Sequence, residues 1–241
     1  MTNGSKRLDY FTRIGLAAFV GLIALWSSPA LNAAEKAGKV RLFILSGQSN
    51  MAGLNPDISF TPTVKAAFAG DEVIVVKDAV GGRPIRCWYK KWKPAGGEVP
   101  KGNGDLYDRL MKKVKAAVAD KKPTTISFVW MQGERDAKTG HGTVYAASLA
   151  GLVGQLRDDL GRKDVDFVIG RLSDHLKKHD GWDQVRKAQA EVAEADKRGA
   201  WIDTDDLNGA NDGLHYDRDG YKTLGQRFAE KAIELIKKAE K

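Results

Sequence analysis

Short runs of apolar residues are spaced along the chain, and longer segments with a mixed apolar and polar pattern lie between them. Each run is rich in β-branched or aromatic residues, and its few charged residues stand at or near its ends, a pattern typical of strands buried on both faces. The runs cover residues 40–45, 72–77, 124–130, 165–172 and 200–203.

The longer segments repeat their apolar residues with helical spacing. They cover residues 106–119, 145–160, 182–197 and 217–241. Gly161 and Gly199 are placed to end the second and third helices, and Asp217 or Asp219 can cap the last one. Strands that alternate with helices in this way predict an α/β fold. We expect a three-layer α/β/α sandwich around a five-stranded parallel sheet.

The start of the chain has a different pattern. Basic residues precede an apolar run at 14–26, and small residues follow it up to Ala34, which is the layout of a secretory signal peptide. We therefore expect residues 1–34 to be removed. Residues 35–241 contain no linker, repeat or composition break, and they predict one domain, secreted or periplasmic, with no stable membrane association. The alternative is an uncleaved N-terminal anchor.

The 241-residue chain carries a formal net charge of +8 and one cysteine, Cys87. Its lysines cluster on expected helix faces, for example at Lys112, Lys113 and Lys115, which is typical of a solvated surface. No recognisable nucleic-acid-binding module accompanies the charge, so we expect no nucleic-acid partner. An exported chain with a single cysteine has no internal disulfide, so the core must stabilise the fold unaided. The sequence does not indicate whether the protein is a monomer or an oligomer.

Ser49 lies just past the end of the first apolar run, after a sharp turn at Gly47. Ligands of open α/β sheets bind at the carboxyl ends of the strands, so this serine can present its hydroxyl to a crevice. Backbone N–H groups around it can face a developing negative charge. Two other motifs are excluded. A P-loop needs lysine after the glycine, where Leu54 follows Gly53, and a nucleophile elbow needs glycine where Met51 stands.

Asp212 and His215 stand directly before the last expected helix. A carboxylate three residues ahead of a histidine can accept from the imidazole Nδ1 and leave Nε2 free to take a proton. Loops after the first and fifth strands of a parallel sheet can meet at one edge. These two residues and Ser49 are therefore a candidate catalytic set in the order Ser, Asp, His. Taken alone, the Asp-x-x-His pattern is more often a turn or a helix cap.

The loop after the third apolar run opens on the same edge and contains Gln132 and Glu134. A glutamine side chain offers an N–H donor that suits an oxyanion hole. Glu134 is either a second acid close to His215 or an anchor for the glutamine loop. Gly82, after the second run, would supply a backbone N–H. The alternative for all of these is an ordinary role in turns and caps.

Four segments together resemble the SGNH hydrolases, in the carbohydrate esterase branch that includes sialate O-acetylesterase-like proteins and family six acetylxylan esterases. The segments are GQSNMAG at 47–53, GGRPI at 81–85, WMQGE at 130–134 and DGLH at 212–215. The first and third are the most specific. In order and spacing, the four segments cover nearly all of the mature chain.

This resemblance implies a flavodoxin-like sheet, with Ser49 as nucleophile, His215 as base and Asp212 as the acid that orients the base. It also implies an oxyanion hole formed by the Ser49 N–H, the Gly82 N–H and the side chain of Gln132. The glutamine stands where many SGNH enzymes have asparagine.

Two side chains are candidate substrate contacts. Arg83 departs from the small polar residue expected after the paired glycines, and a charged arm there would reshape the acyl pocket or contact substrate. Trp88 is the other candidate, and with Tyr89 and Trp92 it forms an aromatic cluster that is either a sugar-stacking wall or packing beneath the lysine-rich loop. His175 and His179 could hold a metal if helical, but the lysines between them favour a solvated face. We expect no metal and no cofactor.

These observations predict an exported serine esterase that removes O-acetyl groups from carbohydrate, such as acetylated xylan, another polysaccharide or sialic acid, through an acyl-enzyme. One alternative is a lipase, thioesterase or arylesterase of the same fold, and another is a non-catalytic sugar-binding protein. Residues 90–105 are the only long irregular loop expected in a compact chain, which suggests an open, shallow site. Such a site suits a small-molecule or polysaccharide ester better than a buried acyl tail.

Overall fold

A parallel sheet of order β2-β1-β3-β4-β5 lies at the centre of the computed structural model, which describes residues 38–241. Its strands are β1 (Val40–Gly47), β2 (Glu72–Ala79), β3 (Thr125–Met131), β4 (Asp166–Gly170) and β5 (Gly199–Ile202). This is the flavodoxin-like order, which reverses direction between β1 and β3. The expected α/β sandwich with a five-stranded parallel sheet is confirmed. The signal peptide expected at residues 1–34 lies outside the described residues.

Helices connect the strands and cover the sheet. The α-helices are α1 (Ser49–Gly53), α2 (Phe60–Ala67), α3 (Asp105–Val118), α4 (Glu134–Lys138), α5 (Gly142–Asp159), α6 (Asp180–Glu194) and α7 (Arg218–Ala239). Short 3-10 helices are η1 (Pro56–Ile58), η2 (Ile85–Cys87), η3 (Asp174–Leu176) and η4 (Asp205–Leu207). Within residues 38–241, none of the helices is both long and apolar enough to span a bilayer.

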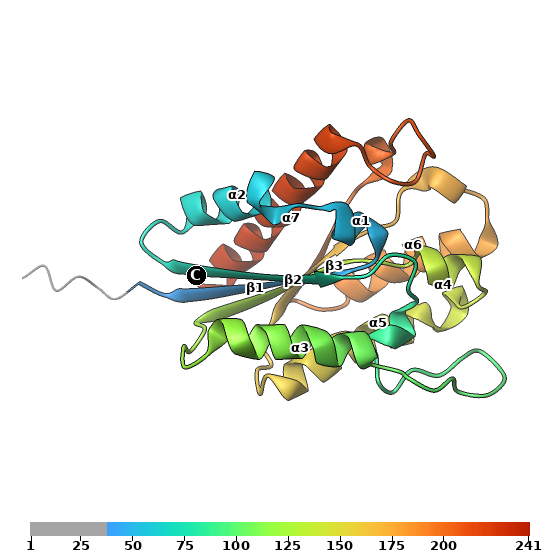
Figure 1. Ribbon diagram of the computed structural model, residues 1–241, viewed down its shortest axis with the longest axis horizontal. Coiled ribbons are helices and arrows are strands. Elements are labelled where there is room, and N and C mark those ends of the chain that lie inside the picture. The colour runs from blue at the N-terminus through green and yellow to red at the C-terminus, as the bar shows by residue number, and fades with distance from the viewer. Residues whose placement is uncertain (1–37) are drawn as a thin grey trace, which may run out of the picture. The chain divides into compact units, whose positions relative to one another are not determined.

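The helices divide between the two faces of the sheet. Figure 1 shows α2 and α7 on one face and α3 on the other, and α5 and α6 share the α3 side of the core. Alternate residues of β1 explain this division: Leu42 and Ile44 enter the core under α3, α5 and α6, whereas Phe43 and Leu45 enter the core under α2 and α7. A strand that buries both faces needs a mostly apolar run, and the one charged residue of β1, Arg41, lies near its start, where it pairs with Asp71 and Glu240.

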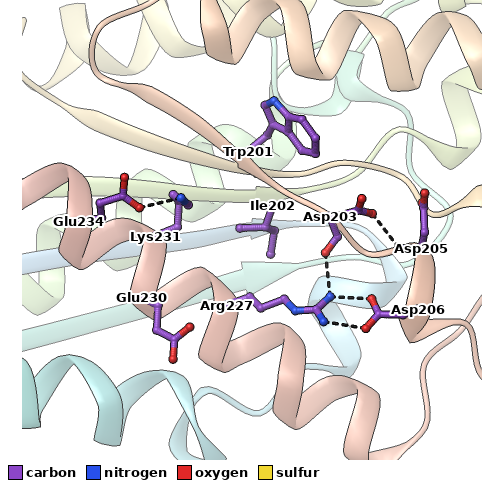
Figure 2. A pocket seen from close by; sticks show the side chains of 9 residues that line it. All are labelled: Trp201, Ile202, Asp203, Asp205, Asp206, Arg227, Glu230, Lys231 and Glu234. Carbon is purple, nitrogen blue, oxygen red and sulfur yellow. Dashed lines mark hydrogen bonds and ion pairs between the residues drawn. The ribbon is translucent and has the colours of Figure 1, made fainter.

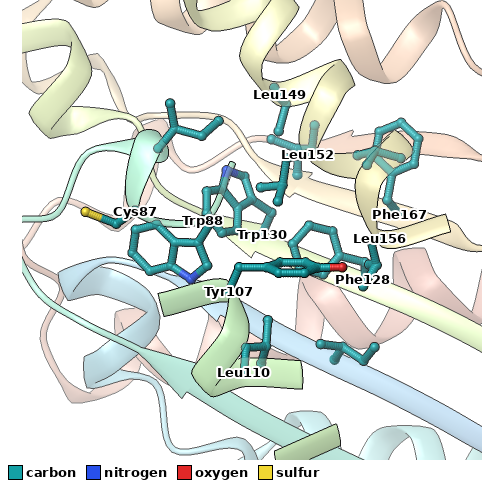
Figure 3. Packing of buried hydrophobic residues seen from close by; sticks show 14 of the residues in the cluster. Cys87, Trp88, Tyr107, Leu110, Phe128, Trp130, Leu149, Leu152, Leu156 and Phe167 are labelled. Carbon is teal, nitrogen blue, oxygen red and sulfur yellow. The ribbon is translucent and has the colours of Figure 1, made fainter. Parts of the chain in front are cut away.

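The aromatic cluster near Trp88 belongs to the first of these cores. Trp88 and Trp92 are 1% and 2% exposed. Figure 3 shows Trp88 beside Trp130 of β3, with Tyr107 of α3 next to them, and the two indole rings meet edge to face at 5.2 Å. Both tryptophans therefore pack inside the core and do not form a sugar-stacking wall at the surface. The proposed contact between Trp88 and substrate is therefore wrong.

Three helices have no counterpart among the segments expected from the sequence. The stretch after Ser49 reads as polar, yet it contains α1 and α2. α4 follows β3 at once. α1 and α4 are five residues each, too short to establish a helical period. α2 carries Pro62 between two threonines, all poor helix formers, and it is stabilised by burying Phe60 and Val64.

The first three strands of the sheet end at the same level. Gly47 of β1 pairs in register with Ala79 of β2 on one side and with Met131 of β3 on the other. The loops that follow these strands therefore emerge side by side at the point where the strand order reverses. Open α/β sheets bind their ligands at this point.

Candidate active site

Ser49 is the first residue of α1 and follows the end of β1 closely. The tight turn between them depends on Gly47, whose φ is +145° and where a Cβ would lie 1.9 Å from the carbonyl oxygen of Met131. Glycine alone permits this approach. The N–H of Gln48 then donates to the same Met131 oxygen at 2.9 Å. As a result, α1 begins directly over the junction of β1 and β3.

Asp212 shapes the turn that carries His215, between η4 and α7. One oxygen of the Asp212 carboxylate accepts from the N–H groups of Leu214 and His215 at 2.9 and 2.8 Å. The other oxygen lies 2.6 Å from Nδ1 of His215. Together these bonds hold the pKa of the Asp212 carboxyl well below its usual range, and the hydrogen bond from the backbone N–H of His215 contributes most. An ionised carboxylate at this place keeps Nδ1 protonated and Nε2 free.

His215 connects this turn to the serine. Its Nε2 lies 3.0 Å from Oγ of Ser49, within the reach required of a general base. The structure therefore brings Ser49, His215 and Asp212 into one continuous chain of contacts. The side chains of His215 and Asp212 are 45% and 49% exposed, so an ester can approach the serine directly from solvent.

Two backbone N–H groups beside the serine have no hydrogen-bond acceptor among residues 38–241, those of Ser49 and Gly82. The Ser49 N–H lies in the first turn of α1, where helix donors are left free. Gly82 has a φ of +66°, a conformation that favours glycine. A Cβ on the preceding Gly81 would lie 3.7 Å from Cβ of Ser49. The loop after β2 thus passes next to the serine and can offer its N–H to an oxyanion.

Gln132 has different partners from those expected. It is fully buried and does not line the pocket that contains Ser49. Its Nε2 lies 2.6 Å from Oδ2 of Asp136, 3.1 Å from the carbonyl oxygen of Arg83 and 3.3 Å from Oε1 of Gln48. An amide nitrogen has two N–H groups, and these acceptors engage both. The geometry argues against an oxyanion donor and for a side chain that fastens three loops together.

Asp136 completes this junction, a role that no sequence motif predicts. Its Oδ2 also accepts from the N–H of Ile85 at 2.8 Å, which anchors the loop that carries Gly82. Burial raises the pKa of its carboxyl to about 6. On the other side of Gln132, the hydroxyl of Tyr145 lies 2.7 Å from the backbone carbonyl oxygen and 3.0 Å from Oε1. The loops after β2 and β3 are thus held by a buried polar network.

Glu134 is 2% exposed and lines the pocket. Its Oε1 lies 3.5 Å from Nδ2 of Asn50, and its Oε2 has no hydrogen-bond partner among residues 38–241. Burial raises its pKa to about 7. Asn50 also donates to the carbonyl oxygen of Leu214 at 3.1 Å. Asn50 therefore ties the serine turn to the histidine turn. Asp212, and not Glu134, is the acid in contact with the His215 ring.

The pocket over the serine has a volume of about 390 Å³. It is lined by Gln48, Ser49, Gly82, Glu134, Arg135, Lys138, Leu214 and His215. Arg135 and Lys138 come from α4, and no sequence motif pointed to them. Arg83 is exposed beside Gly82 but does not line the pocket. Of the two substrate contacts expected from the sequence, neither forms part of the pocket wall.

Residues 38–241 contain no cluster of three or more His, Cys, Asp or Glu side chains that could hold a metal ion. His179 has a structural role, because its Nδ1 accepts from the N–H of Trp182 at 3.3 Å and caps α6. The ring of His175 packs against the same tryptophan, with 5.7 Å between centroids. Neither histidine is part of the pocket over Ser49.

A second hollow, of about 670 Å³, lies beside the edge strand β5. Figure 2 shows that its basic side chains are already paired. Arg227 makes two contacts of 2.6 Å with Asp206, and Lys231 lies 2.6 Å from Glu234. The hollow has no serine, cysteine or histidine in its wall, so it offers no nucleophile and base for ester chemistry.

Solved structures share this fold at low sequence identity. A protein from Arabidopsis thaliana has a TM-score of 0.65 at 20% identity, over 80% of this chain and 98% of that one. A carbohydrate acetylesterase from Xanthomonas citri has a TM-score of 0.60 at 17% identity, over 82% of this chain and 56% of that one. NanS has a TM-score of 0.60 at 12% identity, over 84% and 98%. No curated protein matches the sequence significantly.

Membership of a family comes from the sequence itself. A model of the carbohydrate esterase family described as sialic acid-specific acetylesterase matches residues 52–234. This match covers well over half of the chain and includes Asp212 and His215, while Ser49 lies just before it. The chain therefore belongs to the carbohydrate esterase family of sialic acid-specific acetylesterases and is a hydrolase that acts on esters.

Proposed function

We propose that this protein is an exported serine esterase that removes O-acetyl groups from carbohydrate through an acyl-enzyme. The observation that carries the proposal is the contact chain in which Ser49 Oγ lies 3.0 Å from His215 Nε2 and His215 Nδ1 lies 2.6 Å from Asp212. Family membership supports ester hydrolysis. The basic, apolar and small-residue succession in residues 1–34 supports export.

The first half of the reaction uses Ser49 as the nucleophile. Oγ attacks the carbonyl carbon of the acetyl ester while Nε2 of His215 takes the hydroxyl proton. The ionised Asp212 stabilises the imidazolium that results. When the tetrahedral intermediate collapses, the bond to the sugar oxygen breaks, and the imidazolium returns its proton to that oxygen. The acetyl group remains on Ser49.

The second half releases acetate. Water gives a proton to His215 and attacks the acetyl carbonyl, and the intermediate then expels Ser49 Oγ, which recovers the proton. In both halves the carbonyl oxygen becomes negatively charged. The free N–H groups of Ser49 and Gly82 are the donors that stabilise it. Gln132 contributes by holding the loop of Gly82 in place.

Acetate release tests the proposal directly. Acetylated xylan, O-acetylated sialic acid and p-nitrophenyl esters of increasing acyl length should be compared with wild-type protein, Ser49→Ala and the control Ser148→Ala. Ser148 lies on α5, where its hydroxyl bonds only to the carbonyl of Val144 in its own helix. We expect release from acetylated sugar, a loss of about 10⁴-fold in Ser49→Ala and none in the control. A preference for long acyl chains would favour the lipase alternative.

A further inference from the structure

We propose that Arg135 is a positioning residue for the oxyanion hole, whose side chain holds the carbonyl of Gly82 and thereby sets the direction of the Gly82 N–H. The inference rests on the proposed esterase function of the same site. It adds a residue that acts on the reaction through Gly82 rather than through the substrate. Arg135 lies in the first turn of α4 and lines the pocket that contains Ser49.

The loop between β2 and η2 is anchored on both sides of its paired glycines, residues 81–82. Before them, the N–H of Val80 donates to the carbonyl oxygen of Gly47 at 3.1 Å. After them, the carbonyl oxygen of Arg83 accepts from Nε2 of Gln132 at 3.1 Å. Two adjacent glycines have more conformational freedom than any other pair of residues. These anchors alone therefore do not fix the direction of the N–H groups between them.

Arg135 supplies a contact within the glycine pair. Its Nε donates to the carbonyl oxygen of Gly82 at 2.9 Å, and this is the only hydrogen bond that Gly81 or Gly82 makes within residues 38–241. Gly82 has a φ of +66°, and a Cβ built on it would lie 3.3 Å from Nη2 of Arg135. The guanidinium therefore lies against this glycine and engages its carbonyl, while the N–H of the glycine stays free for an oxyanion.

The main chain of Arg135 is itself fixed relative to the nucleophile. Its N–H lies 3.3 Å from Oε1 of Gln48, the residue that precedes Ser49. Its carbonyl oxygen accepts from the N–H and the hydroxyl of Thr139, at 3.0 and 2.8 Å. Arg135 thus contacts the turn of the nucleophile through its main chain and the loop of Gly82 through its side chain. This arrangement sets the separation of the two oxyanion donors, the N–H groups of Ser49 and Gly82.

Such a role should act on kcat and not on KM, because an oxyanion donor stabilises charge that forms only in the transition state. Complete loss of one donor typically costs about 10²- to 10³-fold in kcat. Without Arg135 the Gly82 N–H is still present but is free to rotate away from the oxyanion. The loss should therefore be smaller, about 10- to 100-fold.

Three replacements of Arg135 separate its hydrogen bond from its charge. In Arg135→Gln the amide nitrogen stands at the same position along the side chain as Nε, so a donor is kept and the charge is removed. In Arg135→Lys the charge is kept, but a methylene stands in the place of Nε. Arg135→Met has the same length up to this atom and supplies neither. The control is Arg218→Met, because Arg218 is exposed on α7 and makes no side-chain hydrogen bond or ion pair within residues 38–241.

The test measures kcat and KM for p-nitrophenyl acetate, together with the melting temperature, for the wild type and these variants. We expect Arg135→Met to lower kcat by about 10- to 100-fold, with KM and melting temperature nearly unchanged. Arg135→Gln should recover kcat to within about threefold of the wild type, because the hydrogen bond is restored. Arg135→Lys should remain close to Arg135→Met, and Arg218→Met should match the wild type.

A double-mutant cycle with Gly82→Ala checks that Arg135 acts through the glycine. The added Cβ meets both the positive φ and Nη2 of Arg135, so the Gly82 N–H is displaced in this variant. Once the donor is displaced, Arg135→Met should lower kcat by less than about threefold further, since two residues that act as one unit are not additive.

Four results would overturn the inference. One is a wild-type kcat in Arg135→Met. Another is a wild-type kcat in Arg135→Lys together with a large loss in Arg135→Gln, which would assign the role to charge that contacts the substrate or the oxyanion directly. The third is an effect of Arg135→Met that falls mainly on KM, and the fourth is a loss that multiplies in full with that of Gly82→Ala. A wild type that hydrolyses no ester would instead refute the proposed function, and the inference with it.

Discussion

Replacement of Glu134 by glutamine should remove a large part of the pH dependence of stability. The carboxyl is buried, one of its oxygens has no hydrogen-bond partner in the described part of the chain, and this burial raises its pKa from 4.5 to about 7. The difference of about 2.5 corresponds to a folding penalty of about 3 kcal/mol for the ionised form, at 1.36 kcal/mol per pKa unit. Glutamine has the same shape and carries no charge at any pH.

The sign of the effect follows from where each state loses its proton. Below about pH 4.5 the group is protonated in both the folded and the unfolded chain, so no penalty applies. Between about pH 4.5 and 7 the unfolded chain ionises first and is favoured, and stability falls. Above about pH 7 the full penalty is present. The stability associated with Glu134 is thus greatest at low pH and is lost as the pH rises through about 7.

Urea unfolding followed by tryptophan fluorescence would measure this effect. From pH 5 to pH 8, the free energy of unfolding of the wild type should fall relative to that of Glu134→Gln by about 2–3 kcal/mol. Glu98→Gln is the matched control, because Glu98 is exposed on the loop after η2, and it should follow the wild type. Parallel pH profiles for the wild type and Glu134→Gln would refute the assignment of a buried, unpaired carboxyl.

Three further predictions concern the candidate site and export. Gln132→Ala should lower the melting temperature, with about 1–3 kcal/mol of stability lost because buried acceptors are left unpaired, and should reduce kcat only modestly; a loss of kcat of about 10²- to 10³-fold at an unchanged melting temperature would show that Gln132 is an oxyanion donor after all. Asp212→Asn should lower kcat by about 10²- to 10⁴-fold even at alkaline pH, measured with p-nitrophenyl acetate, because the tautomer of His215 is no longer fixed. N-terminal sequencing of protein from the native host should begin near Ala34, and an intact Met1 in a membrane fraction would identify an anchor instead.

The sheet was largely predictable because its strands are buried on both faces. Such strands require runs rich in apolar residues, and all five runs correspond to observed strands with ends that differ by a few residues. The expected run at 165–172 extends beyond β4 because Arg171 leaves the sheet and pairs with Asp203 and Asp205. The long amphipathic helices were equally visible, and Asp217 caps α7 through the N–H of Gly220.

The short helices α1 and α4 were not predictable, because five residues are too few to show a helical repeat of apolar positions. α1 and α4 follow the ends of β1 and β3, the neighbouring strands between which the strand order reverses. The consequence for function is large, since α1 presents Ser49 and α4 presents Arg135 and Lys138.

The meeting of Ser49, Asp212 and His215 could be anticipated, because parallel strands bring their carboxyl ends to one edge. The direction of the Gln132 side chain could not be anticipated from the sequence. Its amide is oriented by Asp136 on one side and by the Tyr145 hydroxyl on the other, and tertiary packing alone makes these residues its neighbours. The same limit applies to Trp88, whose burial depends on contact with Trp130 across the core.

The nucleophilic role of Ser49 is the central claim, and covalent trapping tests it most directly. A serine-directed phosphonate should label the wild-type protein once per molecule and abolish ester hydrolysis in proportion to labelling. Peptide mass spectrometry should locate the adduct on Ser49, 3.0 Å from the His215 base, and Ser49→Ala should take up no label. Inactivation with the adduct on another residue, or more than a few per cent of wild-type activity in Ser49→Ala, would contradict the account.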